Sequence, residues 1–418
     1  MGRRCVIRAA VIIGMVCLAA GCEREKTDDG NNLPGTVTVS PNMDEKDNGN
    51  HEAISSPNGY TEYQESPVWQ EGVAKGELQV AEKRLPKQED VMELSLPQIG
   101  VYGGEAQFAA VNADTVTREL VSEGLFCYAA DGTVAPNIAK AYRVNSDFTE
   151  YTIYLREGMR WSDGVLFTSD DCIFFYEKLC LPEVFGEALW SCFISKDASG
   201  RTEKAVFTKL DRYSFRINFS SSKPEFLSEL LAQGGICFAP EHYFVNLLPE
   251  YMGEDAAAAK AKDMGYTDTD MMLKETVSNA WNTPGVPTLN PFCISTEEGK
   301  GDVRGSSYEF VRNPYYWKTD EAGKQLPYLD KLVFTRISGE TQKMLLTTEG
   351  YLTVSALHGE QVGEARSMTD RGNYRLITWQ NFSDYAVKNG LKNFPEGCPY
   401  EARVRGIGAA HVEGWYME

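Results

Sequence analysis

The chain has 418 residues and a formal net charge of −19 at pH 7, with 42% hydrophobic and 24% charged residues. This length exceeds one compact domain and predicts two or three, with enough apolar residues for a sizeable core. The strong negative charge disfavours nucleic acid and anionic lipid headgroups as partners and promotes solubility outside the cell.

The N-terminus has the composition of an export signal. Basic residues within the first eight positions precede an apolar run from Ala9 to Ala20, which is too short for a membrane span, so we expect residues 1–21 to be removed. The sequence Ala19-Ala20-Gly21-Cys22 resembles the lipobox of bacterial lipoproteins. That resemblance implies a lipid anchor on Cys22, and a plain secretory cleavage nearby is the alternative.

Residues 22–90 differ in composition from the rest of the chain. They are rich in Asp, Glu, Asn, Gly, Ser and Pro and poor in bulky apolar residues. Such a segment cannot bury enough apolar surface to offset its ordering entropy. We predict a disordered acidic tether that holds the folded body away from the membrane, and a binding segment is the alternative.

Strand and helix patterns alternate from about Val91 onward. The pattern predicts a strand at Glu105 to Ala109 and then a helix from Asp114 to Phe126. We expect further strands at residues 150–156, 215–219, 308–312 and 331–337. We expect further helices at residues 170–180, 224–233 and 256–265. This mixture predicts an α/β fold.

The stretch WSDGVLFTSDD, Trp161 to Asp171, concentrates acids and hydroxyls in eleven positions. It could form a catalytic or metal site, or a structural junction. Ser162-Asp163-Gly164 has the residues of a tight turn, and Thr168 to Asp171 has the pattern of a capping box with acids in a first helical turn. An EF-hand needs alternating acids and a Glu at position twelve, which are absent. We therefore interpret the stretch as strand, turn and helix start.

Motifs for enzymatic chemistry are missing from the sequence. There is no GxSxG, GxxxxGK[ST] or GxGxxG motif in a suitable context, so no catalytic residue and no cofactor is expected. The four His residues are scattered, and the seven cysteines after Cys22 contain no CxxC pair, so we expect no metal site. The adjacent acids Asp170 and Asp171 point in different directions on a helix and cannot flank a glycosidic bond.

Several short motifs follow one another in an order typical of one bacterial family. The motifs are Tyr102-Gly103-Gly104, Glu123-Gly124-Leu125, Pro136-Asn137-Ile138-Ala139, Trp161-Ser162-Asp163-Gly164, Asn290-Pro291-Phe292 and Arg312 to Trp317. Over about residues 95–380 the chain thereby resembles the extracellular solute-binding proteins of family 5, which serve oligopeptide, dipeptide and nickel ABC importers. One departure is Asn290, since the family usually has Gly at this position.

The resemblance implies a large periplasmic-binding-protein-like fold of class II. In such a protein two lobes close on a ligand and leave its covalent bonds unchanged. Lobe I is expected at residues 91–126 and 283–380, and an inserted domain II at residues 127–282. Residues 381–418 do not resemble the family, so we expect the second lobe to be truncated and ligand binding to be impaired.

We therefore expect a lipid-anchored substrate-binding component of an ABC importer. It would capture oligopeptides on the extracellular or periplasmic face of the cell membrane and deliver them to permease subunits. Candidate ligand-binding residues are Asn112, after the first strand, and Phe185 and Trp190, after the helix of the inserted domain; ordinary loop and core roles are their alternatives. An oligosaccharide-binding protein of the same fold, a secreted glycosidase, and a surface adhesin or sensor are the alternative functions.

Overall fold

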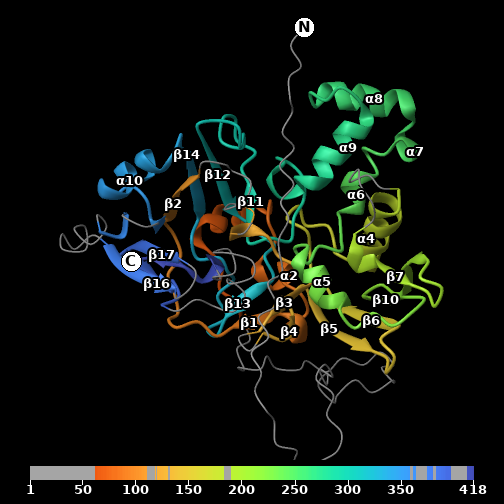
Figure 1. The fold of residues 1–418 in the computed structure, drawn as a ribbon. Helices are drawn as coiled ribbons and strands as arrows, with labels where there is room; N and C mark the ends of the chain where they lie inside the picture. Colours follow the sequence, from red (N-terminus) through yellow and green to blue (C-terminus); the bar gives the residue numbers. More distant parts are fainter. Residues whose placement is uncertain are drawn as a thin grey trace, which may run out of the picture. The chain divides into compact units, whose positions relative to one another are not determined.

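The computed structural model describes residues 62–110, 118, 120–129, 132–182, 190–357, 361–363, 374–379, 383–396 and 412–418. All of them belong to one compact unit of the chain, Lys46–Glu418. Figure 1 shows helices and strands alternating along this unit. No helix within the described ranges combines the length and the apolar character that a bilayer crossing needs.

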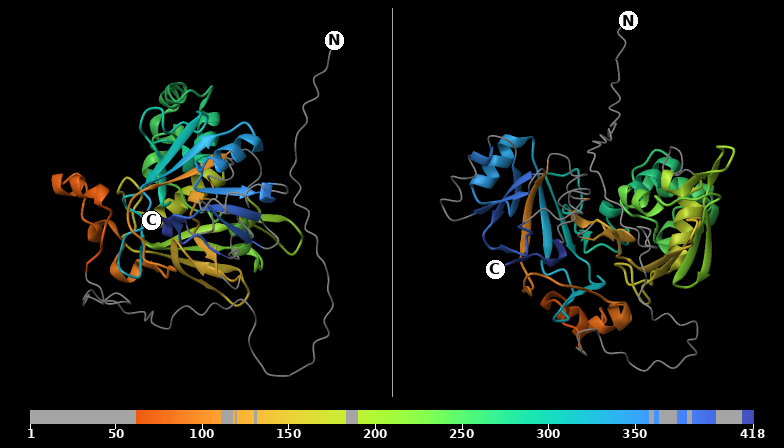
Figure 2. Two further views of the ribbon diagram at one scale, coloured as in Figure 1. Left: turned by 90° about the vertical axis from the view of Figure 1, so that its left-hand side faces the viewer. Right: turned by 60° about the horizontal axis from the view of Figure 1, so that its bottom comes forward.

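A four-stranded sheet joins two segments that are far apart in the sequence. Its strand order is β11 (Phe292–Ile294), β12 (Ser307–Arg312), β14 (Lys331–Arg336) and β2 (Glu105–Ala110). Strands β2 and β14 pair in parallel, and the other pairs are antiparallel. Figure 2 shows the orange β2 beside the blue β14. Alternate residues of β2 are buried, as expected for a strand with one face on a core.

A three-stranded sheet packs beside this one. Its order is β15 (Val354–Leu357), β17 (Ser383–Lys388) and β16 (Tyr374–Trp379), and helix α10 (Glu340–Thr348) precedes it. The two sheets are joined by paired hydrogen bonds between Gln107 and Thr353, both of 2.8 Å. Stacked rings such as Phe108 and Phe334, with centroids 5.0 Å apart, fill their shared core.

Residues between these two segments form a second four-stranded sheet, which is antiparallel throughout. Its order is β5 (Ala139–Val144), β6 (Glu150–Leu155), β10 (Ser214–Asn218) and β9 (Val206–Asp211). Buried residues of α4 (Ser169–Phe174), its π-helical continuation η3 (Phe175–Cys180) and α5 (Phe226–Ala232) complete its core. Tyr176 of η3 stacks on Phe207 of β9 with ring centroids 3.9 Å apart.

Shorter elements surround this second core. The small strand pairs are β3 (Phe126–Tyr128) with β4 (Val134–Pro136) and β7 (Ile194–Lys196) with β8 (Thr202–Lys204), and the short helix η4 is Ser191–Phe193. The chain then returns through α6 (Glu241–Phe244), α7 (Pro249–Met252), α8 (Glu254–Asp263), α9 (Thr269–Ser278) and η5 (Ala280–Asn282). Asp268 caps α9 by accepting a hydrogen bond from Met271 N at 2.8 Å.

The N-terminal part of the described chain differs from the predicted tether. It contains η1 (Pro67–Trp69), α1 (Gln70–Lys75), α2 (Ala81–Arg84), η2 (Gln88–Asp90) and β1 (Met92–Leu94), which pairs with β13 (Lys318–Asp320). Arg84 is fully buried, pairs with Glu65 and donates to the Pro314 carbonyl. The prediction of a tether over residues 22–90 is therefore wrong from residue 62 onward. Composition is an average, and a few buried side chains suffice to hold this segment on the body.

The C-terminal residues also hold structure that their composition did not indicate. Strand β18 (Leu391–Lys392) pairs with β19 (Tyr416–Met417), which follows η7 (Val412–Gly414). Trp415 is 0% exposed, and its ring centroid lies 5.0 Å from that of Phe394. Gly and charged residues dominate the composition of residues 381–418, and single aromatic anchors hold the described part in the core.

Most predicted elements between these ends are confirmed. The expected strands correspond to β2, β6, β10, β12 and β14, and the expected helices to α4 with η3, α5 and α8. The helix predicted from Asp114 to Phe126 is wrong beyond Val121, because residues 122–124 are not helical and β3 begins at Phe126. A Cβ on Gly124 would lie 3.0 Å from Gly235 Cα, so the two backbones approach too closely here for a residue with a side chain.

Candidate ligand-binding site

An aromatic cavity of about 200 Å³ opens between the inserted residues and the segments on either side of them. Its aromatic lining consists of Trp161, Phe175, Trp190, Phe238, Phe244 and Trp281. Its polar lining consists of Arg118, Ser122, Ser278, Thr288 and Asn290. Apolar walls with a few placed polar groups are typical of ligand sites, and this volume suits one group of a larger ligand.

Trp161 lines the cavity at the turn that the sequence predicts. Gly164 has a φ of +91°, a left-handed conformation that glycine adopts without strain. Asp163 Oδ1 accepts a hydrogen bond from Val165 N at 3.1 Å, which closes the turn. The Trp161 side chain is 2% exposed, and its ring packs edge-on against Phe167 at 5.5 Å. The predicted tight turn is confirmed.

The predicted capping box at the start of α4 is also confirmed. Asp171 Oδ2 accepts from Thr168 N at 2.9 Å, and the Thr168 hydroxyl accepts from Asp170 N at 3.3 Å. Asp171 Oδ1 accepts from Glu241 N at 3.1 Å and so connects α4 to α6. Burial is the main influence on this carboxyl and raises the pKa of Asp171 to about 6 despite these hydrogen bonds. The acidic and hydroxyl groups of this stretch that are named here therefore have structural partners.

A chain of hydrogen bonds runs from this turn to Asn290. Ser162 N donates to Thr288 O at 2.9 Å, and Thr288 N donates to Ser162 Oγ at 3.0 Å. The Thr288 hydroxyl accepts from Asn290 N at 3.1 Å. From the other side, Glu123 N donates to Asn290 Oδ1 at 2.9 Å. Both the backbone and the side-chain amide of Asn290 are thereby fixed.

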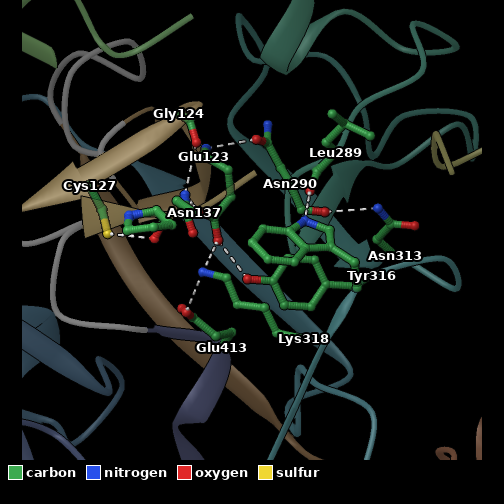
Figure 3. Close-up of polar contacts among 12 residues, drawn as sticks. Glu123, Gly124, Cys127, Asn137, Leu289, Asn290, Asn313, Tyr316, Lys318 and Glu413 are labelled. Atoms are coloured by element: carbon green, nitrogen blue, oxygen red, sulfur yellow. Dashed lines mark hydrogen bonds and ion pairs between the residues drawn. The ribbon is translucent and has the colours of Figure 1, made fainter. Parts of the chain in front are cut away.

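Next to this chain of hydrogen bonds lies a buried charged centre (Figure 3). Lys318 Nζ lies 2.7 Å from Glu123 Oε1 and 3.3 Å from Glu413 Oε1. Glu123 also accepts from Asn137 Nδ2 at 2.6 Å and from the Tyr316 hydroxyl at 2.5 Å. Burial lowers the pKa of Lys318, but the two carboxylates outweigh it and leave the pKa above its ordinary value. Lys318 therefore stays protonated in the folded protein.

Two cations flank the Trp317 ring beside this centre. Arg156 Cζ and Lys318 Nζ each lie 5.0 Å from a Trp317 ring centroid, a distance suited to cation–π attraction. Arg156 also donates to Asn137 O at 2.8 Å, and burial lowers its pKa to about 10. None of the charged groups named here lines the cavity. We interpret the buried charges as the contact that holds the inserted residues Asn137 and Arg156 to Lys318 at the start of β13 and to Glu413 of η7.

The predicted site residues have different outcomes. Trp190 lines the cavity, with its ring centroid 5.8 Å from that of Phe175. Asn112, Phe185 and Cys22 lie outside the described residues. Sequence reasoning missed Trp281 and Asn290 as lining residues. The departure from the family's usual Gly was the one available signal for Asn290.

Metal and disulfide chemistry have no support in the described part of the chain. No group of three or more His, Cys, Asp and Glu side chains there could hold a metal ion. Cys172, Cys180, Cys192 and Cys237 are buried thiols that form no disulfide.

The discontinuous sheet, the inserted domain and the cavity beside it define a periplasmic-binding-protein-like fold. The sequence model of the bacterial extracellular solute-binding proteins, family 5 Middle, matches residues 133–385. The chain belongs to this family of solute-binding proteins, as its motifs predict.

Solved structures confirm the expected fold class. The oligopeptide-binding protein OppA matches with a TM-score of 0.66 and 23% identity over 76% of this chain and 49% of that chain. The periplasmic binding protein MelB from Agrobacterium fabrum, in complex with stachyose, matches with a TM-score of 0.54 and 21% identity over 77% of this chain and 49% of that chain.

Relatives with a described ligand class cover two kinds of solute. The periplasmic alpha-galactoside-binding protein of Rhizobium meliloti is 29% identical over 306 residues, which are 65% of this chain and 39% of the relative. The periplasmic oligopeptide-binding protein OppA of Salmonella typhimurium is 35% identical over 72 residues, which are 17% of this chain and 13% of the relative. The chain therefore spans half or less of the length of the relatives it matches.

Proposed function

We propose that this chain is the substrate-binding component of an ABC importer and captures oligopeptides outside the membrane for delivery to permease subunits. One observation carries the proposal: in a chain of family 5, a cavity of aromatic rings and a few hydrogen-bonding groups, one of them the cation Arg118, lies beside the inserted domain. Rings and a few polar groups hold a ligand by burial and hydrogen bonding and leave its covalent bonds intact.

A lipid anchor on Cys22 belongs to the same proposal. The apolar run before it and the small residues at positions 19–21 support cleavage directly before this cysteine. Expression in a bacterium fed radiolabelled palmitate should label the wild-type protein in the membrane fraction. Cys22→Ser should abolish the label and release the protein, whereas unlabelled wild-type protein would contradict the anchor.

Oligosaccharide binding is the second candidate for the ligand. Two similar proteins favour it: one is named as an alpha-galactoside-binding protein, and the other was solved in complex with stachyose. Aromatic faces also cover sugar rings. In this version the same cavity would hold a pyranose, and delivery to a permease would be unchanged.

Titration calorimetry with matched panels separates the two candidates. We expect peptides of two to six residues to bind and raffinose-type sugars to give no heat. Trp190→Ala should weaken peptide binding about tenfold, because an aromatic wall is lost. Tyr351→Ala, which truncates a 56% exposed ring outside the cavity, is the control. Binding of sugars alone would transfer the proposal to the second candidate, and binding of neither panel would overturn both.

A further inference from the structure

The side-chain amide of Asn290 has a donor that no protein group satisfies in the described part of the chain. Its Oδ1 accepts from Glu123 N at 2.9 Å, which determines where the nitrogen of the amide lies. The other hydrogen bonds of Asn290 use its backbone N and O. In Figure 3 the Nδ2 atom points away from the charged centre.

The place of this donor in the cavity indicates a ligand. Asn290 is only 7% exposed and lines the cavity. The Nδ2 atom is not one of the described buried side-chain atoms that lack a hydrogen-bond partner, so this donor remains accessible to a molecule outside the protein. An acceptor atom on a bound molecule can replace the water that an accessible donor binds, so the amide can donate to a carbonyl-type oxygen.

The size and walls of the cavity identify a second part of the ligand. An apolar cavity of about 150 Å³ is enough to take up benzene, so about 200 Å³ holds one six-membered ring or one branched aliphatic group. Trp161, Phe175 and Phe244 are each at most 2% exposed and line it. Burial of an apolar group against such walls is favourable.

We infer that this cavity binds one aromatic or branched apolar side chain of a peptide while Asn290 Nδ2 donates to the adjacent backbone carbonyl. The inference rests on the proposed peptide capture and specifies which residue type the ligand carries. A pyranose fits less well, because each of its buried hydroxyls needs a partner and most of the cavity wall is apolar. Asn290 is then a specificity-determining residue.

A single-residue probe tests the cavity apart from oligopeptide capture. N-acetyl-phenylalanine amide carries one ring and an adjacent carbonyl, and its binding is followed by intrinsic tryptophan fluorescence of the full chain. We expect saturable binding below about 10 mM, the range of a small fragment. No saturable change with this probe would overturn the inference even if oligopeptides bind elsewhere on the protein.

Two substitutions separate the roles of the ring pocket and the donor. Ala280→Leu adds bulk to the cavity wall and should remove the preference for Ala-Phe-Ala over Ala-Ala-Ala, which we expect to be at least about tenfold in the wild type. Ala256→Leu, at an exposed position of α8, is the matched control. Asn290→Asp keeps an oxygen for Glu123 N and replaces the donor, so it should weaken both peptides about tenfold and leave their ratio unchanged.

The outcomes distinguish this inference from the proposed function. If the ratio of the affinities for Ala-Phe-Ala and Ala-Ala-Ala is the same in wild type and Ala280→Leu, the cavity does not bind the ring and this inference is wrong. Peptide capture itself would remain supported. Binding of the phenylalanine probe without binding of any peptide would support the pocket and overturn peptide capture. Thermal unfolding of each variant shows whether it has lost its fold. If Ala280→Leu does not fold, Trp190→Ala serves as a second cavity variant and should lower the preference for Ala-Phe-Ala over Ala-Ala-Ala.

Discussion

The ammonium group of Lys318 lies between Glu123 and Glu413, and the residue is 2% exposed. Taking a cation out of water costs several kcal/mol, and here two carboxylates offset that cost. The cation in turn keeps the two acids compatible. If Lys318 is removed, both carboxylates remain buried without their common partner.

Lys318→Met should therefore lower the free energy of unfolding by about 3–5 kcal/mol, measured by urea denaturation at pH 7. Lys209→Met is the control, because its partner Asp170 lies 2.6 Å away with both side chains about half exposed. Exposed pairs of this kind contribute about 1 kcal/mol or less. Equal losses in the two variants would contradict the role of the buried centre.

Asp171 makes a second residue-scale prediction, which concerns pH. Its pKa is about 6 in the folded protein against an ordinary value of 3.8, so the folded state binds more protons between these values. The stabilising contribution is complete below about pH 4 and is lost as the pH rises through 6. A shift of this size corresponds to about 3 kcal/mol.

We expect the difference in free energy of unfolding, wild type minus Asp171→Asn, to fall by up to about 3 kcal/mol between pH 4 and 7. Asn keeps one oxygen for the backbone donors but does not titrate. Asp170→Asn removes the exposed neighbouring carboxylate and is the control. A difference for Asp171→Asn that stays constant over this pH range would disprove the assignment.

At the scale of elements, β19 shows how a short segment depends on one anchor. The strand has two residues, Tyr416–Met417, and pairs only with β18 among the described strands. Trp415 directly before it is fully buried. Asn393 Nδ2 donates to Gly414 O at 2.9 Å. This hydrogen bond adds little to stability, because water replaces it in the unfolded state, whereas burial of the indole ring adds much more.

Trp415→Ala should lower the free energy of unfolding by about 3–5 kcal/mol, because it leaves a cavity in the core. Calorimetry measures the loss. Tyr351→Ala, at a 56% exposed ring, should cost far less. A melting temperature unchanged by Trp415→Ala would mean that the C-terminal residues do not pack on the body.

Local elements were predictable from sequence, and long-range sites were not. The turn at Asp163-Gly164 and the capping box at Thr168 depend on residues within four positions of one another, so their patterns are readable. The charged centre brings Glu123, Lys318 and Glu413 together from distant positions. Nothing near any of these residues in the sequence indicates its partners. The residues that line the cavity also come from distant positions, so the sequence does not indicate that they meet.

At the scale of the whole molecule, the thiols report on the integrity of the core. Cys172, Cys180, Cys192 and Cys237 are all buried in the core of the inserted domain. Burial raises the pKa of Cys192 to about 12 and raises the pKa of Cys172 and Cys237 as well. Little reactive thiolate therefore forms at neutral pH.

Alkylation with iodoacetamide, mapped by peptide mass spectrometry, should leave these four cysteines unmodified in the folded protein. Labelling should follow the unfolding transition in urea. A Val206→Cys variant supplies an internal control, since this position is 59% exposed and should react at once. Rapid labelling of Cys172 or Cys237 without denaturant would show that the core opens locally.

The parallel pairing of β2 with β14 also bears on the order of events during synthesis. The ribosome makes β2 first, and its partner emerges only after the whole inserted domain has been translated. The antiparallel sheet of the insert can close as soon as β10 exists, since it needs no later strand. A nascent chain therefore carries β2 without its partner β14, and β1 without its partner β13, while the insert is being made, and an unpaired strand edge is a template for pairing with another chain.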